Sequence, residues 1–146
     1  MVRTDHQILG IIFKKGYSGI YYLVLKRNTM QGGFWQPVTG GVEDNETLEE
    51  ALRREIREET GIKDIVRIIP GIQAHRFYAP RAVYEYAFGV EVRPGTRVKL
   101  SGKEHSDARW CDYKTARSLM VWPGNRTALE RLDSILRNEQ NNAETS

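Results

Sequence analysis

The hydrophobic positions of the chain form short apolar runs, most of them bounded by glycine, proline or charged residues. Apolar and β-branched residues dominate 7–13 and 20–26, and the segment 14–19 between them is rich in lysine, glycine and serine. Two such runs around a turn-forming segment predict a β-hairpin or two neighbouring strands. The other predicted strands are a short extended piece at 34–38 and the segments 62–69, 82–92 and 108–111.

A helix is predicted over 47–60, in the middle of the chain. Thr47 and Glu50 form a capping-box pattern at its start, and Gly61 is placed for a left-handed C-cap. The apolar residues of this segment recur at helical spacing, so they form a stripe that should face the protein interior. That stripe consists of Leu48, Ala51, Leu52 and Ile56.

A second helix is predicted over 126–137, where leucine and isoleucine recur at helical spacing and Asn125 is placed to cap the first turn. The tail 138–146 is polar, so we expect it to be frayed. Strands on both sides of a central helix, followed by a last helix, favour an α/β fold with a mixed sheet covered by helices. The length of 146 residues suits one domain, which we place at 1–137.

The composition narrows the classes of function. Hydrophobic residues make up 40% and charged residues 28% of the chain, and no apolar run approaches the roughly 20 residues that span a bilayer. Cys111 is the single cysteine, which excludes an internal disulfide framework and favours a reducing, cytoplasmic location. The net charge of +3 is mild and spread along the chain, so it suits a small anionic substrate and does not indicate a nucleic-acid groove.

Three carboxylates, Glu55, Glu58 and Glu59, fall within or beside the apolar stripe of the central helix. Like charges so close raise one another's pKa and destabilise the fold unless a cation lies among them. A hard divalent cation meets this need, and Mg²⁺ is the usual ion where phosphates complete its shell. Gly40 and Gly41, just upstream, would let backbone atoms approach the same place. Taken alone, such a helix has an alternative interpretation as a solvated surface helix held by salt bridges.

The spacing around this helix is more specific than its charge. Gly40 is followed after five residues by Glu46, and after seven more by Arg54-Glu55-Ile56. One residue later comes Glu58-Glu59, and one residue after that Gly61-Ile62. This arrangement resembles the Nudix box at each of its defining positions.

The resemblance implies an α/β/α sandwich with a mixed sheet, in which the box forms a loop–helix–loop. Glu58 and Glu59 match the family's main metal ligands, and Glu55 would bind through water or serve as a base. The Gly40 carbonyl often joins the metal shell. The implied cofactor is Mg²⁺, with Mn²⁺ as a substitute, and the implied reaction is hydrolysis of a phosphoanhydride bond.

Further roles follow from the same resemblance. Arg54 and Glu46 match residues that brace the loop against the helix. A second acid commonly assists from a loop outside the box, and Glu104 is the candidate here, with a polar loop residue as the alternative. His105, its neighbour, is expected to be structural or solvent-facing rather than a ligand.

Three segments outside the box are similar to the dihydroneopterin triphosphate/dATP pyrophosphohydrolase branch of the family. They are Phe34–Gly40, His75–Pro80 and Trp122–Arg126. This similarity implies a nucleoside or pterin triphosphate as substrate, cut to a monophosphate and pyrophosphate.

Aromatic and basic residues near these segments are candidates for substrate binding. Trp35, Tyr78 and Trp122 could offer a flat surface to a planar base, with core or edge packing as the alternative for each. Arg27 and Arg76 could meet phosphate oxygens, or could be solvated charges at strand ends.

Other functions stay open at this point. The main rival is a dinucleoside polyphosphate hydrolase or a broad house-cleaning nucleotide pyrophosphatase. A non-catalytic Nudix-like ligand-binding module usually loses box carboxylates, whereas this chain keeps Glu55, Glu58 and Glu59. Members of the family are often homodimers, but no residue of this sequence reports an oligomeric state.

Overall fold

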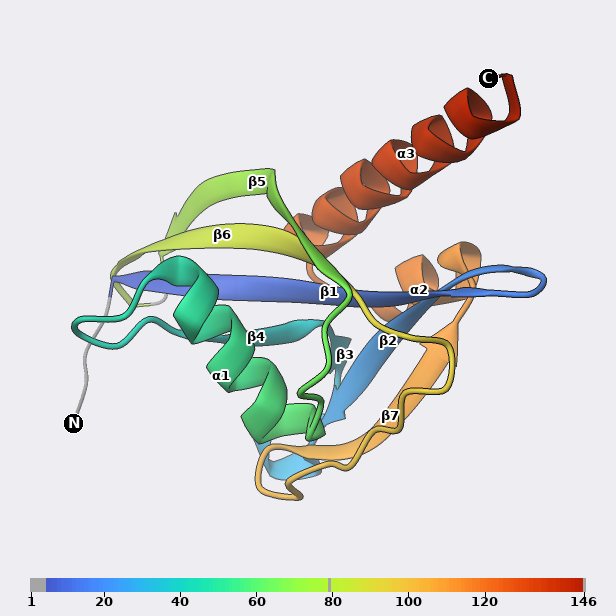
Figure 1. Ribbon diagram of the computed structural model, residues 1–146. Coiled ribbons are helices and arrows are strands. Elements are labelled where there is room, and N and C mark those ends of the chain that lie inside the picture. The colour runs from blue at the N-terminus through green and yellow to red at the C-terminus, as the bar shows by residue number, and fades with distance from the viewer. Residues whose placement is uncertain (1–4, 79, 146) are drawn as a thin grey trace.

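Within the residues that the computed structural model describes, 5–78 and 80–145, seven strands form one sheet with helices on both faces (Figure 1). The strands are β1 (His6–Gly16), β2 (Gly19–Arg27), β3 (Trp35–Gln36), β4 (Val38–Gly41), β5 (Arg67–Tyr78), β6 (Ala82–Glu91) and β7 (His105–Cys111). The helices are α1 (Leu48–Thr60), α2 (Tyr113–Leu119), α3 (Pro123–Thr145) and a 3₁₀ turn at Thr29–Gln31. No helix of this described part is long and apolar enough to cross a membrane.

Strand β1 lies at the centre of the sheet and has strands on both of its edges. One edge pairs in parallel with β6, which in turn pairs with β5. The other edge is divided: 7–10 pair antiparallel with β4, and 13–16 pair antiparallel with β2. Strands β3 and β7 then pair with β2. The sheet is therefore mixed, which confirms the expected fold class.

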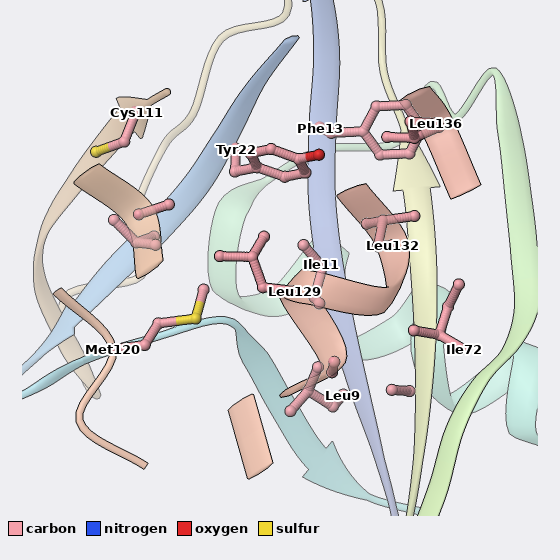
Figure 2. Close-up of a cluster of buried hydrophobic side chains, with 14 residues drawn as sticks. Leu9, Ile11, Phe13, Tyr22, Ile72, Cys111, Met120, Leu129, Leu132 and Leu136 are labelled. Atoms are coloured by element: carbon pink, nitrogen blue, oxygen red, sulfur yellow. The ribbon is translucent and has the colours of Figure 1, made fainter. Parts of the chain in front are cut away.

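Alternate residues of β1 supply two separate hydrophobic cores. Ile8 and Ile12 belong to the core beneath α1. Leu9 and Ile11 belong to the core on the opposite face, where Leu129 of α3 is fully buried (Figure 2). Since side chains alternate along a strand, one extended segment packs against both helical layers. The α/β/α sandwich implied by the resemblance is confirmed.

The hairpin of β1 and β2 and the central helix α1 agree with the sequence predictions, but the strand predicted at 62–69 does not. The described strand starts at Arg67 and continues to Tyr78, past Pro70-Gly71. The register of the pairing with β6 is irregular between Ile69 and Gln73, and Gly71 has a φ of 72°. The Pro-Gly pair therefore makes a bulge within the strand instead of ending it.

The C-terminal part contains more helix than the sequence predicts. Helix α2 was not predicted; Asp112 caps it by accepting a hydrogen bond from the backbone N–H of Thr115 at 2.9 Å. Helix α3 begins at Pro123, so Asn125 lies inside its first turn and is not its cap. The helix also extends to Thr145, whereas 138–146 were expected to be frayed.

An ion-pair network fixes this extension of α3. Arg67 of β5 donates hydrogen bonds of 3.1 and 2.7 Å to the two carboxylate oxygens of Glu139. The same guanidinium donates at 2.8 Å to Glu91 of β6. A bidentate pair of this kind ties the turn of α3 that carries Glu139 to the sheet, and the exposed turns after it project beyond the sheet (Figure 1).

Candidate active site

Helix α1 is held at both ends by local interactions. The Thr47 side chain accepts a hydrogen bond from Glu50 N at 3.1 Å, and the Glu50 carboxylate accepts one from Thr47 N at 2.8 Å. At the other end Gly61 adopts a φ of 73° and donates its N–H to Arg57 O. The predicted capping box and left-handed C-cap are confirmed, so the register of the carboxylates on α1 is fixed by its own sequence.

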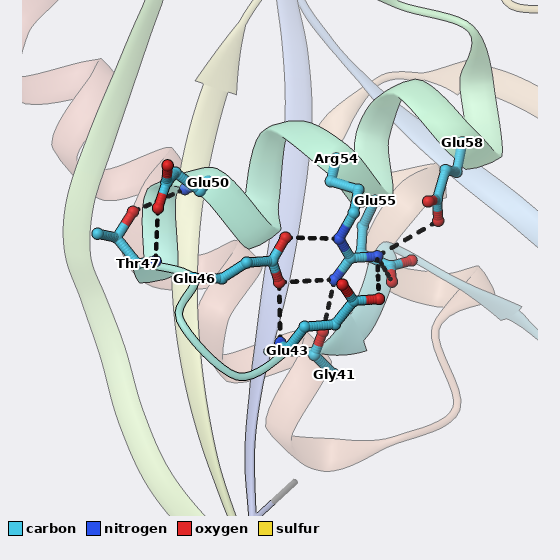
Figure 3. A network of polar contacts seen from close by, with 8 residues as sticks. All are labelled: Gly41, Glu43, Glu46, Thr47, Glu50, Arg54, Glu55 and Glu58. Atoms are coloured by element: carbon cyan, nitrogen blue, oxygen red, sulfur yellow. Dashed lines mark hydrogen bonds and ion pairs between the residues drawn. The ribbon is translucent and has the colours of Figure 1, made fainter. Parts of the chain in front are cut away.

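The guanidinium of Arg54 lies at the centre of a ring of acceptors (Figure 3). It donates at 2.7 and 3.0 Å to the two oxygens of Glu46 and at 2.8 Å to the Gly41 carbonyl. It also donates at 2.7 Å to Glu55 and at 3.3 Å to Glu58. Arg54 thus joins the loop that precedes α1 to the helix itself, as the resemblance implies.

Gly40 of β4 lies directly against Glu55 of α1. A Cβ atom built on Gly40 would overlap the Cγ and Cδ atoms of the Glu55 side chain. Only the hydrogen side chain of glycine leaves room for the carboxylate at this position. The glycine therefore sets how closely the helix and its acids approach β4.

The environment shifts the pKa values of this network in opposite directions. Burial raises the pKa of Glu55, and the hydrogen bond from Arg54 only partly opposes this effect. Glu46, in contrast, has its pKa lowered, chiefly by its hydrogen bonds from Arg54. Arg54 itself has its pKa raised by these carboxylates and is charged at any physiological pH. Of Glu46 and Glu55, Glu55 is thus the acid whose ionised form is less well compensated.

A second group of polar side chains continues from the end of α1 into β7. His105 Nδ1 and Glu59 Oε2 are 2.7 Å apart, and both side chains are buried. Glu104 binds Arg27 at 3.3 Å, and ligand atoms of Glu59, Glu104 and His105 lie within 4.8 Å of one another. Of the two alternatives expected for His105, a structural role and a solvent-facing one, the structure agrees with the structural role, because its side chain is only 2% exposed.

The donor chemistry of these two groups fits a hard divalent cation. Glu55 and Glu58 share Arg54, Glu59 lies with Glu104 and His105, and Glu58 is about half exposed and accessible to a ligand. Acidic groups outnumber guanidinium groups around them, so the cluster carries excess negative charge. Carboxylate and carbonyl oxygens are the ligands that Mg²⁺ prefers. In addition, His105 Nε2 and Arg27 Nε are buried without a hydrogen-bond partner in the described part of the chain.

Comparison with known proteins places this architecture in a family. The family model of the NUDIX domain matches residues 7–132, which include the sheet, α1 and most of the second core.

The chain belongs to the NUDIX domain family.

Individual relatives of this NUDIX chain carry different names. A dihydroneopterin triphosphate diphosphatase of Escherichia coli is 31% identical over 111 residues, 67% of this chain and 73% of that protein. An octanoyltransferase of Myxococcus xanthus is 35% identical over 114 residues, 75% of this chain and 31% of that protein. A solved Listeria monocytogenes structure assigned to the NUDIX hydrolases is 31% identical, with a TM-score of 0.81, and the match covers 92% of this chain and 95% of that one. The chain spans 19% to 50% of the first three curated relatives that it matches.

A cavity of about 460 Å³ lies on the face of the sheet that α3 covers, opposite α1, and reaches β4 just before the NUDIX box. Thr39 of β4 lines it, and Thr39 precedes the Gly40 that contacts Glu55. Its other walls come from β1, β5, β6 and the start of α3. Strand β4 therefore contributes neighbouring residues to the cavity and to the carboxylate cluster.

Some of the other candidate residues of the NUDIX chain lie at the cavity or near the box, and two lie at neither place. Tyr78 and Trp122 line the cavity and are 70% and 51% exposed. Arg27 lies at Glu104, close to the box. Trp35 packs against the α3-side core and does not line the cavity, and the exposed Arg76 stacks on the ring of Tyr78.

Several residues that the sequence analysis did not single out also lie at these places. Glu85 and His75 line the cavity together with Gln7, although they come from three different strands. The contact of His105 with Glu59, across 46 positions of sequence, was not predicted either. The alternating pattern of β6 did hold one signal, because Glu85 is a charged residue in a position where a half-buried strand should be apolar.

Proposed function

We propose that this NUDIX chain is a hydrolase that cuts a phosphoanhydride bond in a nucleotide-like triphosphate with the help of a divalent cation. Mg²⁺ is the proposed ion and Mn²⁺ a substitute for it. The substrate would be a (deoxy)nucleoside or pterin triphosphate, and the products a monophosphate and pyrophosphate. A small-molecule substrate and a cytoplasmic location belong to the same proposal.

One observation carries this proposal: in a chain whose family is established, α1 keeps all three box carboxylates, with Glu55 against Gly40 and with Glu58 and Glu59 near enough to Glu55 to raise its pKa. A ligand-binding module that had lost catalysis would not need to keep these acids together. Glu58 and Glu59 would hold the cation, with the Gly40 carbonyl joining its shell and Glu55 bound to it through a water. Bound there, the cation would neutralise phosphate oxygens and lower the pKa of an attacking water.

The residues of the chain have separate roles in the proposed reaction. Water attacks phosphorus, the P–O bond of the anhydride breaks, and pyrophosphate leaves with the bonding electrons. Glu55, whose pKa is raised by burial, is suited to take the proton from the water. Arg54 orients Glu55 through their 2.7 Å hydrogen bond, and it is a positioning residue.

Glu104 is the other candidate for the base. It lies in the segment before β7, within the group that also contains Glu59 and His105. However, its side chain is 42% exposed, and Arg27 already pairs with its carboxylate at 3.3 Å. We therefore assign the base to Glu55 and give Glu104 an assisting role at the cation or the phosphates.

A substrate panel with Mg²⁺ tests the proposal, with products separated by chromatography. The panel contains dihydroneopterin triphosphate, the common nucleoside triphosphates, diadenosine tetraphosphate and ADP-ribose. Pyrophosphate release from a triphosphate is the expected result. Preferred cleavage of the dinucleotide with release of ATP would contradict the substrate class, and absence of turnover with every compound would contradict the activity.

Substitutions on α1 separate the cation site from the fold. Glu58→Gln and Glu59→Gln should each lower Mg²⁺-dependent turnover by about 10²-fold or more, which is the cost of losing a charge-stabilising group. Glu49→Gln, an exposed change on the same helix, is the control and should keep full activity. Full activity in Glu58→Gln or Glu59→Gln would contradict the assignment of the metal ligands.

A further inference from the structure

We propose that the cavity beside the box selects a fused ring with the 2-amino-4-oxopyrimidine edge shared by guanine and pterins, and that Glu85 reads this edge. This inference rests on the proposed function and narrows its substrate class. It makes Glu85 a specificity-determining residue that accepts hydrogen bonds from the ring N–H and the neighbouring amino group.

Glu85 is a buried carboxylate with little compensation for its charge. Its residue is 5% exposed, in the middle of β6, and it lines the cavity. Gln7 Nε2 donates a hydrogen bond to Oε2, and His75 Nε2 lies 3.7 Å from Oε1, beyond hydrogen-bond distance. Neither contact is a guanidinium or an ammonium group. Buried carboxylates are normally paired or fully hydrogen-bonded, so this one has acceptor capacity left for a ligand.

Other buried acids of the described chain are compensated differently. Asp133 is 6% exposed, but it accepts a 2.6 Å hydrogen bond from Tyr22 and pairs with Arg137 at 2.6 Å. Glu59, also 6% exposed, pairs with His105 Nδ1 at 2.7 Å, and the partly buried Glu91, on the same strand as Glu85, pairs with Arg67 at 2.8 Å. These acids therefore have structural partners within hydrogen-bond distance. The carboxylate of Glu85 lines a cavity instead.

The cavity has the size and walls of a site for a planar ring. Its volume of about 460 Å³ falls in the range of small-ligand pockets. Phe77, Tyr78 and Trp122 supply aromatic surface around it. Trp122 stands edge-on against Phe34, with 5.4 Å between ring centroids, so its ring is held in place despite its 51% exposure. Aromatic side chains placed in this way can stack on a base of any identity, so selectivity has to come from polar groups.

An ionised carboxylate distinguishes bases because it can only accept hydrogen bonds. Guanine and pterins offer two adjacent donors, a ring N–H and an amino group, and both can bind one carboxylate. Adenine and cytosine offer an amino group beside an unprotonated ring nitrogen. The lone pair of that nitrogen would face a lone pair of the carboxylate oxygen, and the two would repel each other. Hypoxanthine offers the ring N–H alone. The side-chain amides of Gln36 and Asn125, both 7% exposed, line the same cavity and can donate to the ring oxygen.

The position of the cavity is compatible with cleavage at the box. Thr39 lines the cavity, and the next residue along β4 is Gly40, in contact with Glu55. Because neighbouring residues of a strand face opposite sides of the sheet, phosphates attached to a ring in the cavity would have to pass the β4 edge of the sheet to reach the carboxylates of α1.

Equilibrium binding without metal tests the inference independently of catalysis. Binding of GMP, IMP, AMP and free pterin would be measured by calorimetry for the wild type, Glu85→Gln and the control Glu91→Gln. The wild type should bind GMP and pterin at least 10-fold more tightly than IMP and AMP, because one good bidentate pair discriminates by about that factor or more. Glu85→Gln should lose this preference. Glu91→Gln, the same isosteric change on the same strand, should keep it.

The outcomes separate the two proposals. Equal or tighter binding of AMP by the wild type, no binding of any of the four compounds, or an unchanged preference in Glu85→Gln would overturn the role of Glu85. Selective GMP or pterin binding without turnover of any triphosphate would instead overturn the proposed hydrolysis and leave the cavity assignment standing. Comparing turnover of GTP with that of dihydroneopterin triphosphate then distinguishes a guanine substrate from a pterin substrate.

Discussion

Gly40 controls the position of a single carboxylate. Because a Cβ at this residue would overlap Glu55, Gly40→Ala has to displace that side chain or the strand. A misplacement of about 1 Å in a catalytic group costs on the order of 10²-fold in rate, so kcat should fall by about this factor. Gly95→Ala, where an added Cβ meets open space, is the control and should be silent. A Gly40→Ala variant with wild-type kcat would show that the contact does not position Glu55.

Glu85 gives a prediction on stability as a function of pH. Burial raises its pKa above the ordinary value of 4.5, against smaller opposing effects of Gln7 and His75. Between the ordinary pKa and the raised one, the folded state binds more protons than the unfolded state, so the free energy of unfolding falls as pH increases through this window. Above the raised pKa the decrease in the free energy of unfolding no longer changes with pH. Well below pH 4.5 this decrease is absent.

Comparison with Glu85→Gln isolates this effect, since His75 is present in both proteins. In metal-free urea unfolding, the wild type should lose stability relative to Glu85→Gln as pH rises from 4 to 8. A constant difference across this range would mean that the carboxylate is not destabilised by burial.

At the scale of elements, Arg54 connects the loop 41–46 to α1 through its planar guanidinium group, which can donate two parallel hydrogen bonds and which lysine lacks. Arg54→Lys keeps the charge but loses the bidentate contact with Glu46, and should destabilise the protein by about 1.5–3 kcal/mol. Its neighbour Arg53 is half exposed and pairs only with Glu49 within α1. Arg53→Lys should therefore stay within about 0.5 kcal/mol of the wild type in chemical denaturation. Similar losses in both variants would contradict the bracing role.

Elements with local signals were predictable from the sequence. Helix α1 carries its own caps in Thr47, Glu50 and Gly61, and its acids follow the fixed spacing of the box, so neighbours in sequence define both. Strand β5 was not predictable in this way, because Pro70-Gly71 indicates a turn and only the pairing with β6 continues the strand beyond it.

The residues of the candidate site also differ in whether local sequence predicts them. The carboxylates of α1 follow from sequence spacing, whereas Glu85, Gln7 and His75 meet only because β6 lies between β1 and β5. The contact between Glu59 and His105 likewise depends on the approach of β7 to the end of α1. Such groups come together through the topology of the sheet, which no short motif encodes.

At the scale of the whole molecule, both hydrophobic cores share the sheet and should unfold together. Leu129 is fully buried in the core beneath α3, so Leu129→Ala should cost about 2.7–5.0 kcal/mol. Val121→Ala, at a half-exposed apolar residue, is the control and should have little effect. Because β1 belongs to both cores, circular dichroism and tryptophan fluorescence should report one transition in each variant. Separate transitions would mean that the two faces of the sheet unfold independently.

Strand β4 has a consequence for self-association. It pairs with β1 alone among the described strands, so no strand covers its other edge. Exposed strand edges template pairing between molecules, and proteins limit this risk by keeping such strands short and flanking them with charge. Strand β4 is four residues long, and the exposed acids Glu43 and Asp44 follow it closely. The backbone beside the carboxylates therefore stays open to a ligand without offering a second molecule an edge on which to polymerise.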